Sequence, residues 1–244
     1  EPARRCSTSL GWSDPRTKEG ELLWEAKFPK SVLSKLKHDL GSLDYAAQFQ
    51  QNPVPSGGGQ FKKEWFRYCD ETPDAYLLES SRGIRSILKD ACWRFGTIDL
   101  AISSKQTADY TVFGVWDVTP TNDIILIDLV RARLDNPEQL KQMHVLYRRY
   151  RPDYFKVERV GYQLALVQQA LADGIPCKEY LPVRDKVSRA STAAVWMENE
   201  KTFLLKTLSE LPAIETELLT FPRSAHDDIV DNFSMSADEV TTGR

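Results

Sequence analysis

Three apolar segments joined by short connections dominate the middle of the chain and limit the folds that it can adopt. They cover residues 93–103, 111–118 and 124–130, and a turn-forming run at 119–123 joins the last two. Continuous apolar runs are typical of strands in a sheet that is covered on both faces. Because the connections are too short for crossovers, we expect an antiparallel, three-stranded meander.

A helix, a strand, a second helix and a further strand are expected after this meander. Asp135-Asn136-Pro137 places proline at the first helical position. A strand predicted at 154–158 is reached by a helical crossover, so we expect it to run parallel to the third strand. Gly174 ends the second helix, and a short strand is expected within 175–183. One buried stripe is expected on each helix, formed by Leu140, Met143, Tyr147 and Tyr150 in the first and by Leu164, Val167 and Leu171 in the second.

The end of the chain adds two more helices. A basic loop is expected at 184–189, followed by a helix at 191–199 and by a last helix that opens near His226. The order β-β-β-α-β-α-β-α predicts an α/β fold: a mixed sheet of three antiparallel strands, then parallel strands reached by helical crossovers, with helices on its faces.

The first part of the chain reads differently. A short helix is expected up to Leu40, ended by Gly41, and a second helical piece at 43–51, followed by a glycine-rich break at 54–59. Strand signals are few, so we expect residues 1–92 to be helical or irregular, to lack a core of their own, and to precede a domain at 93–244.

Bulk composition excludes several classes of function. The net charge of −3 gives no global signature of nucleic-acid binding, so such a function would need a local basic patch. The four cysteines are widely spaced without a C-x-x-C pair, which argues against a zinc site or a disulfide framework and fits a reducing compartment. No apolar run is long enough for a membrane span. The chain begins at Glu1 rather than at Met, which suggests a piece of a longer protein.

The stretch from His226 to Asp231 contains three carboxylates and one of the three histidines of the chain. Two unit charges about 4 Å apart repel by about 4 kcal/mol at an effective dielectric constant of about 20. Such a cluster therefore needs a cation or strong donors. The alternative is a solvated helix start, where Asp is favoured by capping and by the helix dipole.

Two acids in the predicted sheet are candidates to complete this cluster. Asp99 interrupts an apolar strand, where Asp is disfavoured, and Glu158 ends another strand. A crossover topology can place the first strand beside the fourth, which would bring both acids together with the last helix. Carboxylate oxygens from several elements suit Mg²⁺ or Mn²⁺. Alternatively, Asp99 pairs with an arginine, and Glu158 with Arg159 or Arg184.

The acids of the last helix can be ranked by their helical positions. A buried face of Ile229, Phe233, Ala237 and Val240 would leave Asp227 and Asp231 roughly opposite the core and Asp228 on the flank. Asp228 is therefore the predicted ligand, Asp227 its outer partner and Asp231 a structural residue. His226 either orients a water or a phosphate, or caps the helix.

These residues resemble the nuclease domain of the large terminase subunit of tailed bacteriophages. The resemblance covers about 93–240 and rests on Asp99 in a first strand, Ala108-Asp109-Tyr110-Thr111, Glu158-Arg159-Val160-Gly161 and His226-Asp227-Asp228-Ile229-Val230-Asp231. It implies a ribonuclease H-like fold. The segment 45–53 resembles the linker that joins the ATPase motor of the family to its nuclease, and no phosphate-loop motif is present, so we expect a nuclease preceded by the tail of the motor.

The resemblance also implies roles for individual residues. Asp99, Glu158 and Asp228 match the metal ligands, with Asp227 as an adjacent catalytic acid, and Asp109 matches an acid without a defined role. Arg184, Lys186 and Arg189 resemble a basic loop near the active site, and their charges could contact DNA phosphates or stabilise the transition state. The alternative for these three cations is a solvated surface loop.

The expected function is a metal-dependent endonuclease that cuts concatemeric double-stranded viral DNA during genome packaging, with two Mg²⁺ or Mn²⁺ ions. The resemblance implies an ATPase domain, a small terminase subunit and a portal as partners of the full-length protein, in the cytoplasm of the infected bacterial host. The alternatives are a Holliday-junction-type resolvase of the same superfamily, or a non-catalytic module that grips DNA or docks the motor.

Overall fold

The computed structural model describes residues 20–50, 59–101, 110–158, 163–224 and 226–242, together with Gly11 and Arg16. The chain divides into two compact units, residues 1–58 and 59–244. In the first unit, α1 (Lys30–Gln50) is interrupted at Gly41, which has φ 75° and ψ 166°. This conformation favours glycine, so the prediction of two helical pieces separated at Gly41 is confirmed.

The second unit contains, within the described residues, a nine-stranded sheet with the order β3-β2-β1-β9-β6-β5-β4-β7-β8. Its centre is the predicted antiparallel meander of β4 (Trp93–Asp99), β5 (Thr111–Val118) and β6 (Ile124–Ala132). All eight residues of β5 are buried. The strand β7 (Phe155–Glu158) runs parallel to β4 and pairs with it, and β8 (Cys177–Tyr180) runs parallel to β7. The expected juxtaposition of the first and fourth strands is therefore confirmed.

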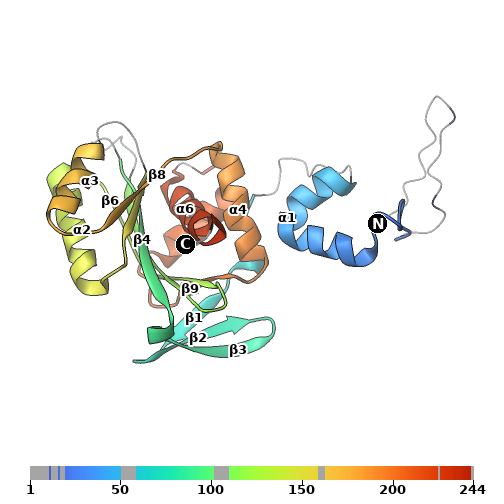
Figure 1. Ribbon diagram of the computed structural model, residues 1–244, viewed down its shortest axis with the longest axis horizontal. Helices are drawn as coiled ribbons and strands as arrows, with labels where there is room; N and C mark the ends of the chain where they lie inside the picture. Colours follow the sequence, from blue (N-terminus) through green and yellow to red (C-terminus); the bar gives the residue numbers. More distant parts are fainter. Residues whose placement is uncertain are drawn as a thin grey trace. The chain divides into compact units, whose positions relative to one another are not determined.

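Helices cover both faces of this sheet, as predicted. The helices α2 (Asn136–Tyr150) and α3 (Gln163–Ala172) lie on one side, and α4 (Lys186–Glu198), α5 (Leu211–Thr220) and α6 (Asp228–Thr242) form the other layer (Figure 1). The start of α2 is fixed by a capping box, in which Asp135 Oδ1 accepts from the Glu138 N–H and Glu138 Oε2 accepts from the Asp135 N–H, each at 3.0 Å.

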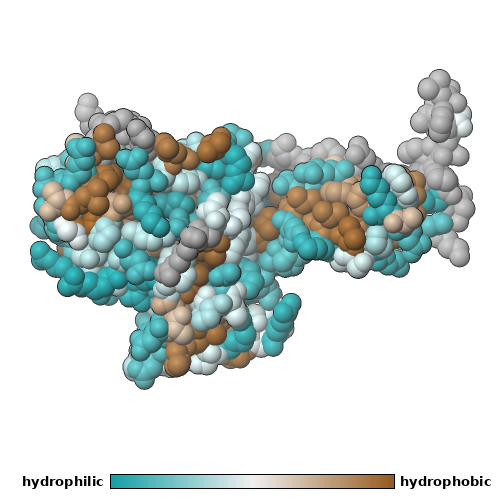
Figure 2. Space-filling view, viewed as in Figure 1, coloured by the Kyte–Doolittle hydropathy of each residue, from teal (hydrophilic) through white to brown (hydrophobic). Residues whose placement is uncertain are grey.

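The buried faces of α2 and α3 differ from the predicted stripes. In α2 the buried residues are Gln139, Met143 and Leu146, whereas Leu140, Tyr147 and Tyr150 are only partly buried. In α3, Leu164 and Leu171 are 41% and 49% exposed, and the buried residues are Leu166, Val167 and Ala170. The helix rests on the face that contains the small Ala170, which allows close approach. Figure 2 shows the resulting hydrophobic surface over the α2–α3 layer.

The prediction that residues 1–92 are helical or irregular is wrong for their second half. The strands β1 (Tyr68–Glu71), β2 (Ala75–Ser80) and β3 (Gly83–Leu88) belong to the main sheet, beside short 3₁₀ turns at Lys63–Trp65 and Lys89–Ala91. They join it through β9 (Thr202–Leu205), which pairs in parallel with both β1 and β6. Because that partner strand comes from the other end of the chain, local signals miss it. The expected boundary at residue 92 accordingly falls inside the second unit.

The helix α6 is buried on nearly all sides, which corrects the two-faced helix expected from the sequence. Ile229, Phe233 and Ala237 are buried as predicted, but so are most of the polar residues between them, namely Asp228, Asp231, Asn232, Ser234, Ser236 and Glu239. The sheet covers one side of α6, and α4 and α5 cover others. The predicted orientation of Asp231 away from the core is therefore wrong.

A buried amide fixes α6 against the sheet. Asn232 Nδ2 donates to the carbonyl oxygens of Thr97 and Val112, each at 3.2 Å, and Asn232 Oδ1 accepts from Thr97 Oγ1 at 2.7 Å. The side chain fits because Gly114 lies beneath it, where a Cβ atom would overlap Asn232 Oδ1. These bonds set the height and rotation of the helix whose first turn carries the acids.

Candidate metal centre

The first two acids of the candidate site lie at the ends of adjacent strands. Asp99 is the last residue of β4 rather than an interior one, and Glu158 is the last residue of β7. The pairing of Ile98 with Val157 places the two acids beside each other at one edge of the sheet. The two carboxyl groups are close enough to influence each other's ionisation.

The helix α6 adds two further acids from its first turn. Asp228 and Asp231 are each 6% exposed. Asp228 Oδ2 accepts from the backbone N–H of Tyr110 at 3.3 Å. The charges of Asp231, Glu158 and Asp228 all act on Asp99. The structure thus brings Asp99, Glu158, Asp228 and Asp231 into one cluster, including the residue that the sequence ranked last.

Electrostatics at this cluster disfavour full ionisation. Burial raises the pKa of Asp99 well above its usual range, and the neighbouring carboxylates raise it further. Burial also raises the pKa of Glu158, against the opposing charge of Arg189, and raises that of Asp231, against Lys186 and Arg189. The cluster therefore carries more negative charge than its surroundings neutralise.

Two cations from the first turn of α4 partly compensate these acids. Lys186 Nζ lies 2.5 Å from Asp227 Oδ1 and 2.7 Å from Asp231 Oδ2. Arg189 is buried and contacts two of the acids. Its Nη2 is 3.0 Å from Asp231 Oδ1, and its Nη1 is 3.6 Å from Glu158 Oε1. Burial lowers the pKa of Lys186, but its bonds to the two aspartates hold it above the usual value.

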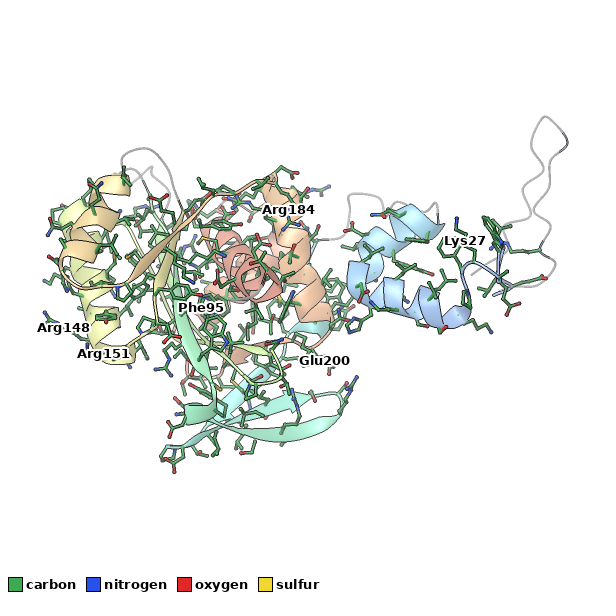
Figure 3. The ribbon with its side chains drawn as sticks, in the orientation of Figure 1. Lys27, Phe95, Arg148, Arg151, Arg184 and Glu200 are labelled. Carbon is green, nitrogen blue, oxygen red and sulfur yellow. The ribbon has the colours of Figure 1, made fainter. Side chains whose placement is uncertain are left out.

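The basic loop expected at 184–189 is in part helical. Asp185 caps α4 by accepting from the Ser188 N–H at 3.0 Å, so the helix begins at Lys186. Arg184 precedes α4 (Figure 3), and its Nη2 lies 2.8 Å from Asp238 Oδ1. Arg184 therefore pairs with a later turn of α6, and the cation that approaches Glu158 is Arg189. Arg159, the other partner considered for Glu158, lies outside the described residues.

The remaining predicted residues have different positions. The Asp227 side chain is 43% exposed and contacts Lys186, which fits an outer partner. The ring of His226 packs edge-on against Tyr110, with 5.0 Å between centroids. Its Nδ1 is buried and forms no hydrogen bond within the described residues. Asp109 lies outside the described part of the chain.

Glu217 of α5 caps α6 and was not identified from the sequence. Its Oε1 accepts from the backbone N–H groups of Ile229 at 2.6 Å and Val230 at 3.2 Å. Its Oε2 lies 3.2 Å from Arg131 Nη2. This carboxylate satisfies N–H groups that His226 was considered to cap, and so fixes the first turn of α6. Its sequence neighbours form an ordinary amphipathic helix, so no local signal distinguishes it.

The donor set fits a hard divalent cation. All candidate ligands are carboxylate oxygens, which Mg²⁺ and Mn²⁺ prefer. Asp231 Oδ1 is buried and accepts no hydrogen bond among the described residues, although it lies 3.0 Å from Arg189 Nη2. Within the same residues, no three acidic, His or Cys side chains already converge at ligand spacing. Side-chain rotations that loosen the contacts of Lys186 and Arg189 would be needed to complete coordination.

Comparisons with known proteins bear on the identity of this fold. A family model described as "Terminase RNaseH-like domain" matches residues 96–238, which is more than half of the chain. A comparison with curated proteins finds no match. None of the described helices has the length and apolar content needed to cross a membrane.

Three solved structures illustrate the similarity. The large terminase nuclease of the thermophilic phage G20c with bound magnesium has a TM-score of 0.53 and 19% identity, covering 76% of this chain and 99% of that one. The same nuclease with bound zinc has a TM-score of 0.50 and 18% identity, covering 71% and 92%. The large terminase of another thermophilic bacteriophage, in complex with ADP, has a TM-score of 0.62 and 10% identity, covering 89% and 53%. This chain therefore spans about half of that ADP-bound terminase.

Proposed function

The chain belongs to the terminase RNase H-like domain family, and from this premise we propose that it is a divalent-metal-dependent endonuclease that cuts concatemeric double-stranded viral DNA during genome packaging. The observation that carries the proposal is the cluster of Asp99, Glu158 and Asp228, which three separate elements bring to one edge of the sheet. The raised pKa values of Asp99 and Glu158 support it, because such perturbed groups gather at functional sites.

Asp99, Glu158 and Asp228 would hold Mg²⁺ or Mn²⁺ through their oxygens. Two such ions, when bound, would activate a water and stabilise the leaving 3′ oxygen. Asp227 steadies Lys186, and Arg189 orients Glu158 and Asp231. Once the acids turn toward metal, Lys186 would lie where it can offset negative charge on the reacting phosphate.

Selection of the cutting position would come from the packaging assembly. A chain with a net charge of −3 has little capacity to read bases. In the full-length protein the partners would be an ATPase domain, a small terminase subunit and a portal, in the cytoplasm of the infected host. The first unit, residues 1–58, would then include the tail of the ATPase region and the linker, a role that the ADP-bound phage terminase supports by its greater length.

A plasmid-nicking assay with Mg²⁺ or Mn²⁺ tests this function. The wild-type chain should convert supercoiled plasmid to nicked and linear forms, and Asp99→Asn should not. Asp173→Asn is the matched control, because it makes the same chemical change beside His144, away from the cluster. Cleavage retained by Asp99→Asn would contradict the assignment of Asp99 as a catalytic residue.

No cleavage by the wild type with any divalent metal would favour a DNA-gripping or motor-docking module instead. Preference for a four-way junction over linear duplex would point to a resolvase.

A further inference from the structure

A second group of charged and aromatic side chains lies on the β6 side of the carboxylate cluster. Tyr110 immediately precedes β5, Arg131 is near the end of β6, and Arg133 follows that strand. The guanidinium carbons of Arg131 and Arg133 both lie 4.1 Å from the centroid of the Tyr110 ring. We refer to these three residues as the Arg131–Tyr110–Arg133 cluster. Two like charges placed on one ring form a positive site that favours an anion nearby.

This cluster is connected to the carboxylates. The Tyr110 N–H donates to Asp228 Oδ2 at 3.3 Å. In the sheet, Val112 pairs with Asp99 on one side and with Arg131 on the other. Residues directly opposite each other project from the same face, so Arg131 shares the face of Asp99, about 10 Å away across two strand spacings. The arginines therefore border the site on its β6 side.

The cations of α4 are held by acids of the site. Lys186 is already held by Asp227 and Asp231, and Arg189 by Glu158 and Asp231. A duplex that approaches the carboxylates carries a phosphate on every nucleotide and needs positive charge near the cut. Lys186 and Arg189 are therefore engaged with acids of the site, and a basic group on its other border would add positive charge for the incoming strand.

The geometry of the Arg131–Tyr110–Arg133 cluster suits a phosphate. A guanidinium that lies over a ring uses its face for that contact, whereas its N–H donors point outward in its own plane. Arg131 is anchored from below, with Nη2 3.2 Å from Glu217 Oε2 and its side chain only 15% exposed. Arg133 comes one residue after the end of β6 and so reaches further along the same edge.

We propose that Arg133, positioned over Tyr110 beside Arg131, contacts a backbone phosphate of the DNA strand that enters the carboxylate cluster. The inference rests on the proposed nuclease function and specifies where that site holds its substrate. The separation of about 10 Å between Asp99 and Arg131 corresponds to the rise of about three nucleotides, at about 3.4 Å per nucleotide along one strand. Arg131 acts as a positioning residue, and Arg133 makes the contact.

The test measures binding of a fluorescently labelled DNA duplex by anisotropy, with Ca²⁺ replacing the metal that supports cleavage. Arg133→Ala should weaken binding about tenfold at low salt, because one charge-assisted contact is lost. The slope of log K against log salt concentration should also fall by about 0.9, the value for one released phosphate contact. Arg133→Lys keeps the charge and should restore most of the slope. Arg148→Ala is the matched control, since Arg148 is exposed on the outer side of α2 (Figure 3).

Equal affinities and equal salt slopes for Arg133→Ala, Arg148→Ala and wild type would overturn the inference. A loss of affinity in Arg133→Ala without a change in slope would also overturn it, because a structural defect weakens binding without removing a phosphate contact. Plasmid nicking by the same proteins separates the two proposals. A wild-type chain that nicks DNA while Arg133→Ala binds normally refutes this contact and leaves the nuclease function intact, whereas a wild-type chain that binds but never nicks refutes the nuclease function alone.

Discussion

Both ends of the β4–β5–β6 meander carry acidic side chains that are buried or partly buried, and the protein surrounds them in opposite ways. At the β5–β6 turn, the side chain of Asp123 is 1% exposed. It accepts hydrogen bonds from Thr119, Thr121, Arg85 and Lys201, at distances of 2.7 to 3.2 Å. At the other end, Asp99 has three acids as its neighbours, and the nearest cations are shared among several carboxylates.

The pKa directions follow this difference in partners. Burial pushes the pKa of Asp123 up, but the bonds from Thr121, Lys201 and Arg85 hold it below its usual value. For Asp99, burial and neighbouring acids act in the same direction and raise the pKa. Asp123, which stabilises the fold, has a hydrogen-bond donor or a cation for its negative charge. The acids at the Asp99 end have fewer donors and cations than carboxylates. Such an imbalance is expected where a ligand of opposite charge completes the site.

The largest effect that separates the two ends should come from Asp228→Asn. Losing one carboxylate ligand should lower plasmid cleavage by at least about 100-fold, while the melting temperature stays close to that of the wild type. Asp123→Asn makes the same chemical change at the other end, and its folded fraction should cleave normally. The contrast fails if the two variants lose cleavage to the same extent.

The free energy of unfolding should show the reverse order, with a larger loss in Asp123→Asn than in Asp228→Asn. Asp123→Asn should lower the free energy of unfolding by about 2–3 kcal/mol, because it leaves Arg85 and Lys201 without their buried partner; the partial exposure of both cations keeps the loss below that of a fully buried pair. Urea denaturation at neutral pH measures this difference.

The pH dependence of the same variant provides a check on its cause. Because the folded-state pKa of Asp123 is lowered from the ordinary 3.8, its stabilising contribution is complete above that value and is lost as the pH falls toward the lowered pKa. The stability gap between wild type and Asp123→Asn should therefore be constant from about pH 7 to pH 5 and should narrow below about pH 4. A gap that does not narrow in acid would mean that the carboxylate charge is not its source.

A smaller effect should distinguish the two acids that share Lys186. Asp231 is buried and contacts both Lys186 and Arg189, whereas Asp227 contacts Lys186 from the surface. Asp231→Asn should lower cleavage about tenfold, because the released cations can compete with metal for the remaining acids. Asp227→Asn should lower it by less than about threefold. Steady-state cleavage rates of the two variants decide the order, and a larger loss in Asp227→Asn would restore the ranking that the sequence favoured.

The smallest expected effect is a gain in stability at the Asp99 end. In metal-free buffer, Asp99→Asn should raise the free energy of unfolding by about 1 kcal/mol, because it removes one of several mutually repelling acids. Urea denaturation in EDTA measures it, with Asp173→Asn as the control for a solvent-accessible aspartate. A loss of stability on Asp99→Asn would show that the surrounding cations and donors already neutralise the acids without metal.

The parts of the fold that could be predicted from the sequence depend on local patterns. The meander followed from apolar runs with short connections, and the adjacency of Asp99 and Glu158 followed from one helical crossover. The orientation of Asp231 could not be predicted in this way. The burial of α6 depends on its packing against α4 and α5, and the sequence of α6 alone does not indicate that packing. The capping role of Glu217 and the pairing of β9 with β1 are likewise long-range features.

The positions of the cations at the site could likewise be predicted only in part from the sequence. The charge of Lys186 and Arg189 was visible in the sequence, but their helical placement depended on the cap at Asp185, and their acidic partners come from α6 and β7. Sequence patterns identified the residue types of the site, whereas the neutralisation of one charge by another required the packed structure.

The most direct test of the central claim, that the Asp99 end of the meander is completed by a divalent cation, is thermal denaturation with and without Mn²⁺. A ligand present at about 100 times its dissociation constant stabilises the folded state by about 2.7 kcal/mol, which corresponds to a rise of about 5–10 °C in Tm for a chain of this size. Wild-type protein should show this rise and Asp99→Asn should not. Equal shifts in both proteins, or no shift in either, would contradict the claim.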